Sequence, residues 1–142
     1  MLEQLLIGSS IICGTVVIHV LFMEALVYWL TKNGMWLTTP PRMIKRTLVL
    51  IAMVLWLVAG LTVSAWLWAG IYLLNGVFEQ LETALYFSIV TFTTLGYGDV
   101  TVNEGWRILA SLTAVNGLII VGLNTAFLVE ALSRINSAQG AK

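Results

Sequence analysis

The sequence predicts an all-α membrane protein with three transmembrane helices and one short helix that re-enters the membrane without crossing it. Of the 142 residues, 59% are hydrophobic and 10% are charged, whereas roughly 25% are charged in a soluble domain. Three apolar runs, Leu5 to Leu30, Leu48 to Leu74 and Ile108 to Val129, each exceed the ~20 residues that a helix needs to cross a bilayer. Residues 75–107 are too polar to cross again and too apolar for an ordinary loop, so this segment is expected to re-enter the membrane.

The composition argues against an enzyme and against a nucleic-acid-binding protein. The formal net charge is zero, so no basic surface for nucleic acid is expected. The single cysteine, Cys13, lies inside an apolar run and is expected to be a small buried hydrophobic side chain. One cysteine and one histidine are too few for a zinc cluster or a catalytic triad. We therefore predict no catalytic residues and no nucleic-acid partner.

The distribution of charge predicts how the chain is oriented in the membrane. The link between the first two apolar runs holds four of the seven basic residues, namely Lys32, Arg42, Lys45 and Arg46. The positive-inside rule places this link and the C-terminus in the cytoplasm, and the N-terminus and residues 75–107 outside. The Pro40–Pro41 pair interrupts any helix through the link. The expected location is the inner (plasma) membrane, as a multi-pass protein.

The segment "LETALYFSIVTFT" predicts the short re-entrant helix, over residues 81–93. It contains no glycine or proline, and Glu82 lies near its start, where the helix dipole favours an anion. About three turns are too short to span a bilayer. Such a helix can dip in from one face and point its negative C-terminal end at the membrane centre, provided that protein or water covers the irregular backbone that follows.

That irregular backbone is "TLGYGD", Thr94 to Asp99. Glycine at alternate positions, Gly96 and Gly98, permits backbone angles that are closed to other residues. Successive carbonyls can then turn the same way instead of alternating as in a strand. A row of carbonyl oxygens, with no thiolate or imidazole among them, suits a hard cation.

This stretch is similar to the T-x-G-Y-G-D selectivity filter of potassium channels, whose carbonyl oxygens replace the hydration shell of the ion. The resemblance extends over Leu48 to Leu132 and is to the pore domain of prokaryotic two-transmembrane channels, with "ALYFSIVTFTTLGYGD" aligned without gaps. The first span has no regularly spaced arginines and does not resemble a voltage sensor. The organisation implied is an N-terminal transmembrane helix and basic link (1–46), a pore domain (47–133) with outer helix 47–74, pore helix 81–93, filter 94–99 and inner helix 106–132, and a short cytoplasmic tail (134–142).

One filter strand cannot surround an ion, so the resemblance implies a homotetramer with potassium as the permeant ion on its axis. The potassium ligands would be the backbone carbonyls of Thr94, Leu95, Gly96 and Tyr97, with the Thr94 hydroxyl. Gly98 and Asp99 would complete the outer mouth. The expected partners are further copies of this chain and the lipid bilayer, with no soluble regulatory domain in the chain.

The inner helix carries the residues expected below the filter. Leu118, Val121 and Thr125 would line a water-filled cavity. Gly117 matches the hinge glycine of the family, and it is read either as a gating hinge or as a close-packing position. Glu130 would form a ring of four carboxylates at the inner mouth or an ordinary ion pair. Two amides within this span, Asn116 and Asn124, are expected to form hydrogen bonds between helices.

Two departures from the family pattern concern the support of the filter. Tyr97 is expected to point away from the axis into a cuff made by Tyr86 and Phe87, and Phe87 is less polar than its counterpart in relatives. Val90 replaces a pore-helix carboxylate that many relatives carry. From this replacement we expect Asp99 to lack a partner and the filter to differ in stability.

Two ionisable residues lie within the first span, and two alternatives to a potassium channel remain. His19 and Glu24 are read either as structural, with Glu24 paired to the basic link, or as sensors of pH. A non-conducting regulatory or assembly subunit would carry a broken filter, and a weakly selective cation channel would carry a changed tyrosine or second glycine. Neither change is present in Thr94 to Asp99.

Overall fold

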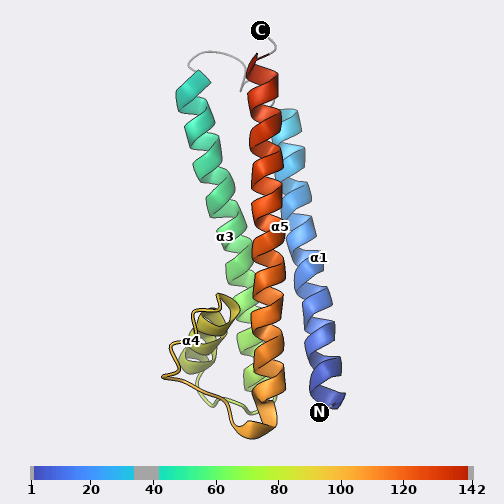
Figure 1. Cartoon of the computed structure of the whole chain (residues 1–142), viewed down its shortest axis with the longest axis vertical. Helices are drawn as coiled ribbons and strands as arrows, with labels where there is room; N and C mark the ends of the chain where they lie inside the picture. The colour runs from blue at the N-terminus through green and yellow to red at the C-terminus, as the bar shows by residue number, and fades with distance from the viewer. Residues whose placement is uncertain (1, 34–41, 141–142) are drawn as a thin grey trace.

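The computed structural model describes residues 2–33 and 42–140, and within them helices are the only regular secondary structure. Three long helices, α1 (Leu2–Lys32), α3 (Arg42–Leu74) and α5 (Arg107–Gly140), run alongside one another (Figure 1). The short helix α4 (Leu81–Phe92) and the 3₁₀ turn η1 (Glu104–Trp106) lie between α3 and α5 in the sequence. All three long helices are apolar and long enough to cross a membrane. The predicted fold class is confirmed, and the chain is a multi-pass membrane protein.

The helix bounds lie close to the predicted ones except at the start of α3 and the end of α5. Helix α3 begins at Arg42, five residues before the predicted start at residue 47, so residues 42–46 of the predicted link are helical. Helix α4 ends at Phe92, one residue before the prediction, and α5 continues to Gly140 instead of ending near Leu132. Residues 133–139 contain no proline or glycine that would stop a helix. Most of the tail predicted for residues 134–142 is therefore helical. The Pro40–Pro41 pair lies outside the described residues.

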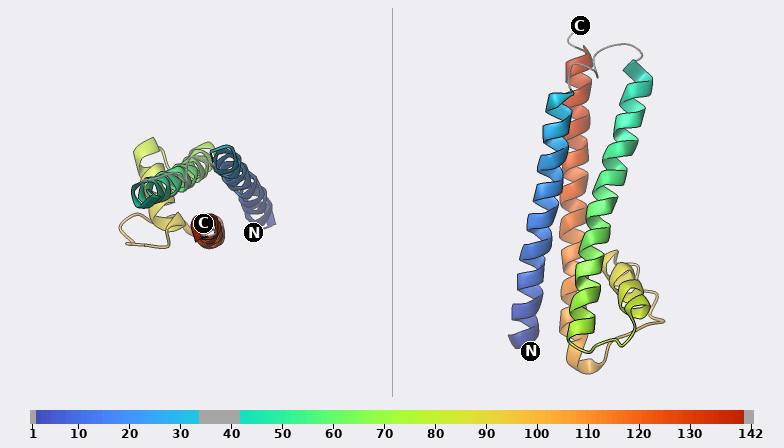
Figure 2. Two further views of the ribbon diagram at one scale, coloured as in Figure 1. Left: turned by 90° about the horizontal axis from the view of Figure 1, so that it is seen from above. Right: turned by 180° about the vertical axis from the view of Figure 1, so that it is seen from behind.

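Different segments of the chain lie at the two ends of the helix bundle. The start of α1 and the segment 75–106 lie at one end, and the ends of α1 and α5 lie with the start of α3 at the other (Figure 1). Seen along the helices, α4 and α1 flank α3 and α5 on opposite sides (Figure 2). The N-terminus and the re-entrant segment therefore share an end, as predicted. The membrane side of each end stays a prediction.

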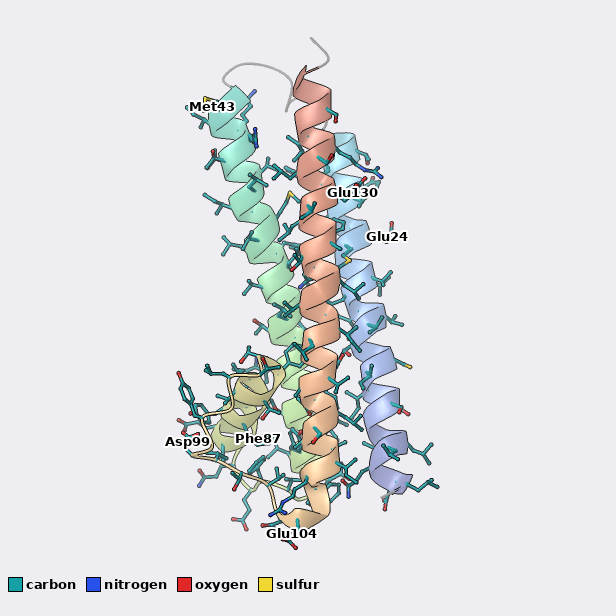
Figure 3. All side chains as sticks on the ribbon, in the orientation of Figure 1. Glu24, Met43, Phe87, Asp99, Glu104 and Glu130 are labelled. Carbon is teal, nitrogen blue, oxygen red and sulfur yellow. The ribbon has the colours of Figure 1, made fainter. Side chains whose placement is uncertain are left out.

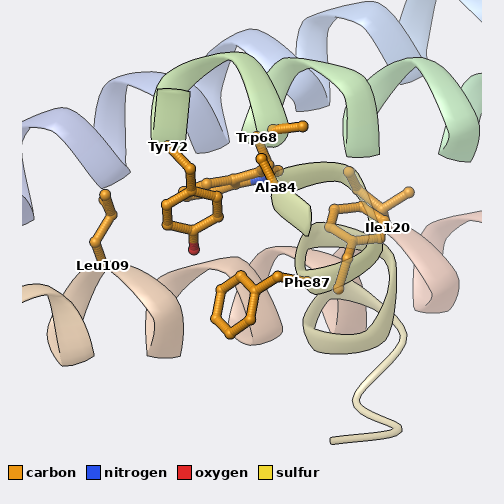
Figure 4. Packing of buried hydrophobic residues seen from close by; sticks show 8 residues of the cluster. Trp68, Tyr72, Ala84, Phe87, Leu109 and Ile120 are labelled. Atoms are coloured by element: carbon orange, nitrogen blue, oxygen red, sulfur yellow. The ribbon is translucent and has the colours of Figure 1, made fainter. Parts of the chain in front are cut away.

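A hydrophobic core joins α4 to the two helices that precede and follow it (Figure 4). Phe87 of α4 packs edge-on against Tyr72 of α3, with ring centroids 5.2 Å apart, and lies 5.1 Å from Phe78. The Tyr72 hydroxyl and Thr113 Oγ1 of α5 are hydrogen-bonded at 2.6 Å. The fully buried members of this core are Trp68, Ala69, Tyr72, Ala84, Leu109 and Ile120. These contacts hold α4 in one place beside α3 and α5.

Few residues of α1 are buried. Helix α1 packs on α3 and α5, so much of its circumference faces outward. Cys13 lies on that outward surface and is exposed, and the prediction of a buried thiol is wrong. Glu24 is exposed as well (Figure 3). The side chain of Arg42, one of its predicted partners, lies outside the described residues.

Candidate functional site

The C-terminal end of α4 reaches the middle of α5. A Cβ atom placed on Gly117 would lie 1.7 Å from the Phe92 carbonyl oxygen and 2.7 Å from its carbonyl carbon. Gly117 is ten residues from the start of α5 at Arg107, which is about 15 Å along the helix axis. Half of a ~30 Å hydrocarbon core is the same distance. With the edge of the hydrocarbon core at Arg107, the negative end of the α4 dipole would lie near mid-membrane depth.

Gly117 is thus a close-packing position in this structure. A residue with a side chain there would meet the backbone of Phe92, which cannot move as a side chain can. Of the two readings of Gly117, close packing has a direct contact to support it. A hinge at this residue stays a prediction.

The backbone after α4 turns back on the helix and then alternates in the sign of φ. The Val90 carbonyl accepts hydrogen bonds from the Leu95 and Gly96 N–H groups at 3.0 and 3.2 Å. Thr94, Gly96 and Gly98 have φ of 59°, 57° and 78°, and the residues between them do not have positive φ. Positive φ is unusual for a β-branched residue such as Thr94, and strained backbone of this kind clusters at functional sites.

The whole stretch from Thr93 to Asp99 is exposed in the single chain. Tyr97 is 68% exposed and Leu95 is 56% exposed. Non-helical backbone at membrane depth is tolerated only where protein buries it or where it lines a water-filled cavity. One chain by itself therefore leaves this site incomplete.

Asp99 has a hydrogen-bond partner, contrary to the prediction made from Val90. The Tyr86 hydroxyl donates to Asp99 Oδ2 at 2.6 Å, and the Val100 N–H donates to Oδ1 at 3.0 Å. The hydrogen bond from Tyr86 is the main cause that lowers the pKa of Asp99 from its ordinary value, and the same bond raises the pKa of Tyr86. The sequence signal for this hydrogen bond was a tyrosine thirteen residues before the aspartate. Tyr86 braces the outer end of the stretch against α4.

We expect Tyr86→Phe to raise the pKa of Asp99 toward its ordinary value of 3.8. A lowered pKa means that the brace is intact above the ordinary pKa and is lost as the pH falls through the folded value. Asp99 is the sole aspartate in the chain, so ¹³Cγ-aspartate labelling gives one carboxyl resonance to titrate by NMR. Tyr97→Phe is the control, because Tyr97 is not among the groups that lower this pKa. Equal midpoints in Tyr86→Phe and the unmodified chain would contradict the brace.

The cuff predicted for Tyr97 is not formed within one chain. Phe87 lies on the side of α4 that faces the core, whereas Asp99 lies at the outer edge of the loop (Figure 3). Phe87 is 7% exposed and Tyr97 is largely exposed. A cavity of about 600 Å³, bordered by Phe87, Val90, Gly96 and Gly98, separates the loop from α4 and α5. Any cuff around Tyr97 would need a neighbouring chain.

The predicted cavity-lining residues lie on the free face of α5. Leu118 and Val121 are 61% and 46% exposed, and Thr125 is exposed. Asn116, Ile120 and Asn124, at helical spacing on the opposite face, are buried. Further along the same helix, Glu130 forms an ion pair with Arg134 at 2.6 Å. The ion-pair reading of Glu130 is the one that a single chain displays, and a ring of carboxylates stays a prediction.

A buried polar cluster, defined as Thr15 and His19 of α1, Ser64 of α3 and Asn116 of α5, joins the three long helices. Asn116 Nδ2 donates to Thr15 Oγ1 at 2.7 Å, and Ser64 Oγ lies 3.4 Å from His19 Nδ1. Asn116 therefore forms the interhelical bond predicted for it. Asn124 does not, because neither of its amide atoms has a partner among the described residues. Thr15 and Ser64 were not predicted, because the only sequence signal for each is a hydroxyl within an apolar span.

We expect Thr15 and Asn116 to be energetically coupled. In a double-mutant cycle of Thr15→Val and Asn116→Leu, the free energies of unfolding should be non-additive by about 1 kcal/mol, the usual size for such bonds in membranes. Thr62→Val is the matched control, since Thr62 bonds only within α3, to the Val58 carbonyl. Its combination with Asn116→Leu should be additive. Additivity in both cycles would show that the Thr15–Asn116 bond does not hold α1 in place.

Comparison with known proteins agrees with this arrangement. Residues 47–134, which exclude α1, match the model of the "Ion channel" family. A protein of Rhodopseudomonas palustris named "putative potassium channel protein" is 37% identical over 59 residues, which are 41% of this chain and 14% of the relative's length. No solved structure gives a significant match. Since the family match covers more than half of the 142 residues, the chain belongs to the ion channel family and is not an enzyme.

Proposed function

We propose that the protein is a potassium-selective channel in which four copies of this chain surround the stretch Thr94 to Asp99. The observation that carries this proposal is the exposed backbone of that stretch, near mid-membrane depth, with positive φ at residues 94, 96 and 98. Alternation in the sign of φ lets successive carbonyls point to one side. Carbonyl rings of this kind replace the hydration shell of potassium.

The tetramer is supported by what the single chain leaves unfinished. The stretch lacks cover on its outer side, Tyr97 lacks a cuff, and the Leu118–Val121–Thr125 face of α5 has no neighbour among the described residues. Four copies around an axis beside α4 and α5 would cover the stretch, complete the cuff around Tyr97 and give this face of α5 a neighbour. Closed symmetry of this kind is the usual form of homo-oligomers. In that assembly, Thr94, Leu95, Gly96 and Tyr97 would present their carbonyls to the ion, and Gly98 and Asp99 would form the mouth.

The electrostatics of α4 favour a cation on that axis. Its C-terminal end lies near mid-membrane depth at Gly117, and a helix C-terminus carries about half a negative charge. Four such ends around one axis would stabilise a monovalent cation in the cavity lined by α5. Asp99, held ionised by Tyr86, would add negative charge at the mouth. With the basic link in the cytoplasm, the mouth would face outward and Glu130 inward.

Ion flux into liposomes tests the proposal. Purified protein should carry potassium much faster than sodium across liposomes that are otherwise tight to both ions. Equal sodium flux would replace the proposal with a weakly selective cation channel. No flux of either ion, from protein shown to be folded and inserted, would favour a non-conducting subunit.

A further inference from the structure

An apolar groove lies between α1 and α3 near the end of the bundle where α1 ends and α3 begins. Its volume is about 310 Å³, within the range of natural ligand pockets. Its floor is formed by Leu26, Val49 and Met53, which are buried and belong to a cluster with Ala131 and Ile135 of α5. Because the floor backs onto α5, the groove opens on the side of α1 and α3 that faces away from α5.

Two tryptophans form the walls of the groove. Trp29 of α1 and Trp56 of α3 are 44% and 41% exposed. The Trp56 Nε1–H donates to the Phe22 carbonyl of α1 at 2.9 Å, and its ring lies 5.1 Å from the Phe22 ring. This contact bridges the two helices and holds one wall in position. The groove is therefore preformed, and Ala52 at its rim keeps it open.

Basic residues continue the two helix faces that line the groove. On α1, Lys32 follows Trp29 by three residues, and its Nζ lies 6.0 Å from the centroid of the Tyr28 ring. On α3, Arg46 precedes Val49 by three residues. Such spacings place side chains on the same helix face, about one turn or 5 Å beyond the groove. Of the nearby carboxylates, Glu130 is paired with Arg134, and Glu24 lies nearer the middle of α1. The groove thus leads from an apolar interior to a cationic end.

We propose that this groove binds an anionic phospholipid, with one acyl chain between Trp29 and Trp56 and the phosphate at Lys32 and Arg46. An amphiphile with one negative end matches both parts of the site. The groove and the free face of α5 lie on opposite sides, so the site stays open to the bilayer in the proposed tetramer. Cationic sites between transmembrane helices bind anionic head groups in this manner.

Native mass spectrometry tests the proposal without any measurement of conduction. Delipidated protein is given an equal mixture of phosphatidylglycerol and phosphatidylcholine, and the lipids that it retains are counted. The unmodified chain should retain phosphatidylglycerol preferentially. Ala52→Trp should remove that lipid by filling the groove, whereas Ala59→Trp, on the same face of α3 two turns away and outside the groove, should retain it.

The basic end is tested by Lys32→Gln with Arg46→Gln. Each basic residue near a membrane surface changes anionic lipid binding roughly fivefold, so the double variant should lose roughly 25-fold in preference for phosphatidylglycerol over phosphatidylcholine. Retention by Ala52→Trp equal to that of Ala59→Trp would overturn the site. Loss of subunits instead of lipid in Ala52→Trp would identify the groove as a contact between copies and overturn it as well.

Fluorescence provides a second measurement that does not depend on a folded Ala52→Trp variant. Phosphatidylglycerol with brominated acyl chains, added at low mole fraction to phosphatidylcholine vesicles, should quench Trp29 and Trp56 in a saturable way. The saturable component should disappear in the Trp29→Phe, Trp56→Phe double variant, although four other tryptophans remain. Quenching that rises only in proportion to the brominated lipid, in both proteins, would contradict a bound lipid in the groove.

Discussion

Gly96→Ala is expected to abolish potassium flux while leaving the helices folded. Gly96 has φ of 57°, and a Cβ there would meet no atom of the chain within 4 Å. The effect therefore arises from the backbone conformation and not from a clash within the chain. Alanine in a left-handed conformation costs about 1–2 kcal/mol, or about 4–8 kcal/mol over the four copies of the proposed tetramer. Since 1.4 kcal/mol corresponds to a factor of ten, the smaller total cost, about 4 kcal/mol, should make the conducting form about a thousandfold rarer.

Gly70→Ala is the matched control for this prediction. A Cβ at Gly70 also meets nothing within 4 Å, but Gly70 lies inside α3 and does not have positive φ. Alanine is a better helix former than glycine, so flux should be unchanged and stability equal or slightly higher. Flux is measured in liposomes, and helix content by circular dichroism. Potassium flux that survives Gly96→Ala would show that ions do not pass along this backbone.

Gly117→Ala is expected to lower stability and flux together. The added Cβ would lie 1.7 Å from the Phe92 carbonyl oxygen, so α4 and α5 must move apart. Overpacking of this kind typically costs about 1–3 kcal/mol. Because Phe92 directly precedes the turn into Thr94, the displacement would reach the filter even though its own residues are unchanged. The thermal midpoint of unfolding in detergent should fall, and so should the rate of potassium flux.

Gly122→Ala is the matched control, because it tests whether any glycine-to-alanine change in α5 lowers the thermal midpoint. Gly122 is five residues further along the helix, and a Cβ there meets nothing within 4 Å. Its thermal midpoint should stay equal or rise. If Gly117 served only as a hinge, Gly117→Ala would also leave stability equal or higher, since alanine favours the helix, and would change gating alone. That result would contradict the close-packing role.

The helices and the irregular backbone after α4 could be predicted because their signals are local. Run length and the lack of charge identify the three spans, and the positions of Gly96 and Gly98 identify the irregular backbone. The end of α5 was placed too early because the fall in hydropathy after Leu132 marks the expected edge of the membrane and not the end of a helix. Helix α5 continues to Gly140.

The contacts between elements could not be predicted, because one sequence does not fix the rotation of one helix against another. The prediction that Asp99 has no partner considered position 90 alone, whereas the hydroxyl of Tyr86, one turn earlier on α4, reaches the carboxylate. Phe87, which was expected beside Tyr97, also packs against two aromatic side chains of the core, Tyr72 and Phe78. The pairing of Thr15 with Asn116 depends in the same way on how α1 packs on α5.

Cryo-electron microscopy of the protein in lipid nanodiscs with potassium chloride tests the central claim most directly. The account predicts four copies around one axis, with the carbonyl oxygens of residues 94–97 from each copy facing that axis and density for ions between them. Each Tyr97 ring should point away from the axis against a neighbouring chain. A single copy or a pair, or four copies whose 94–97 backbone faces lipid or the outside of the assembly, would contradict it.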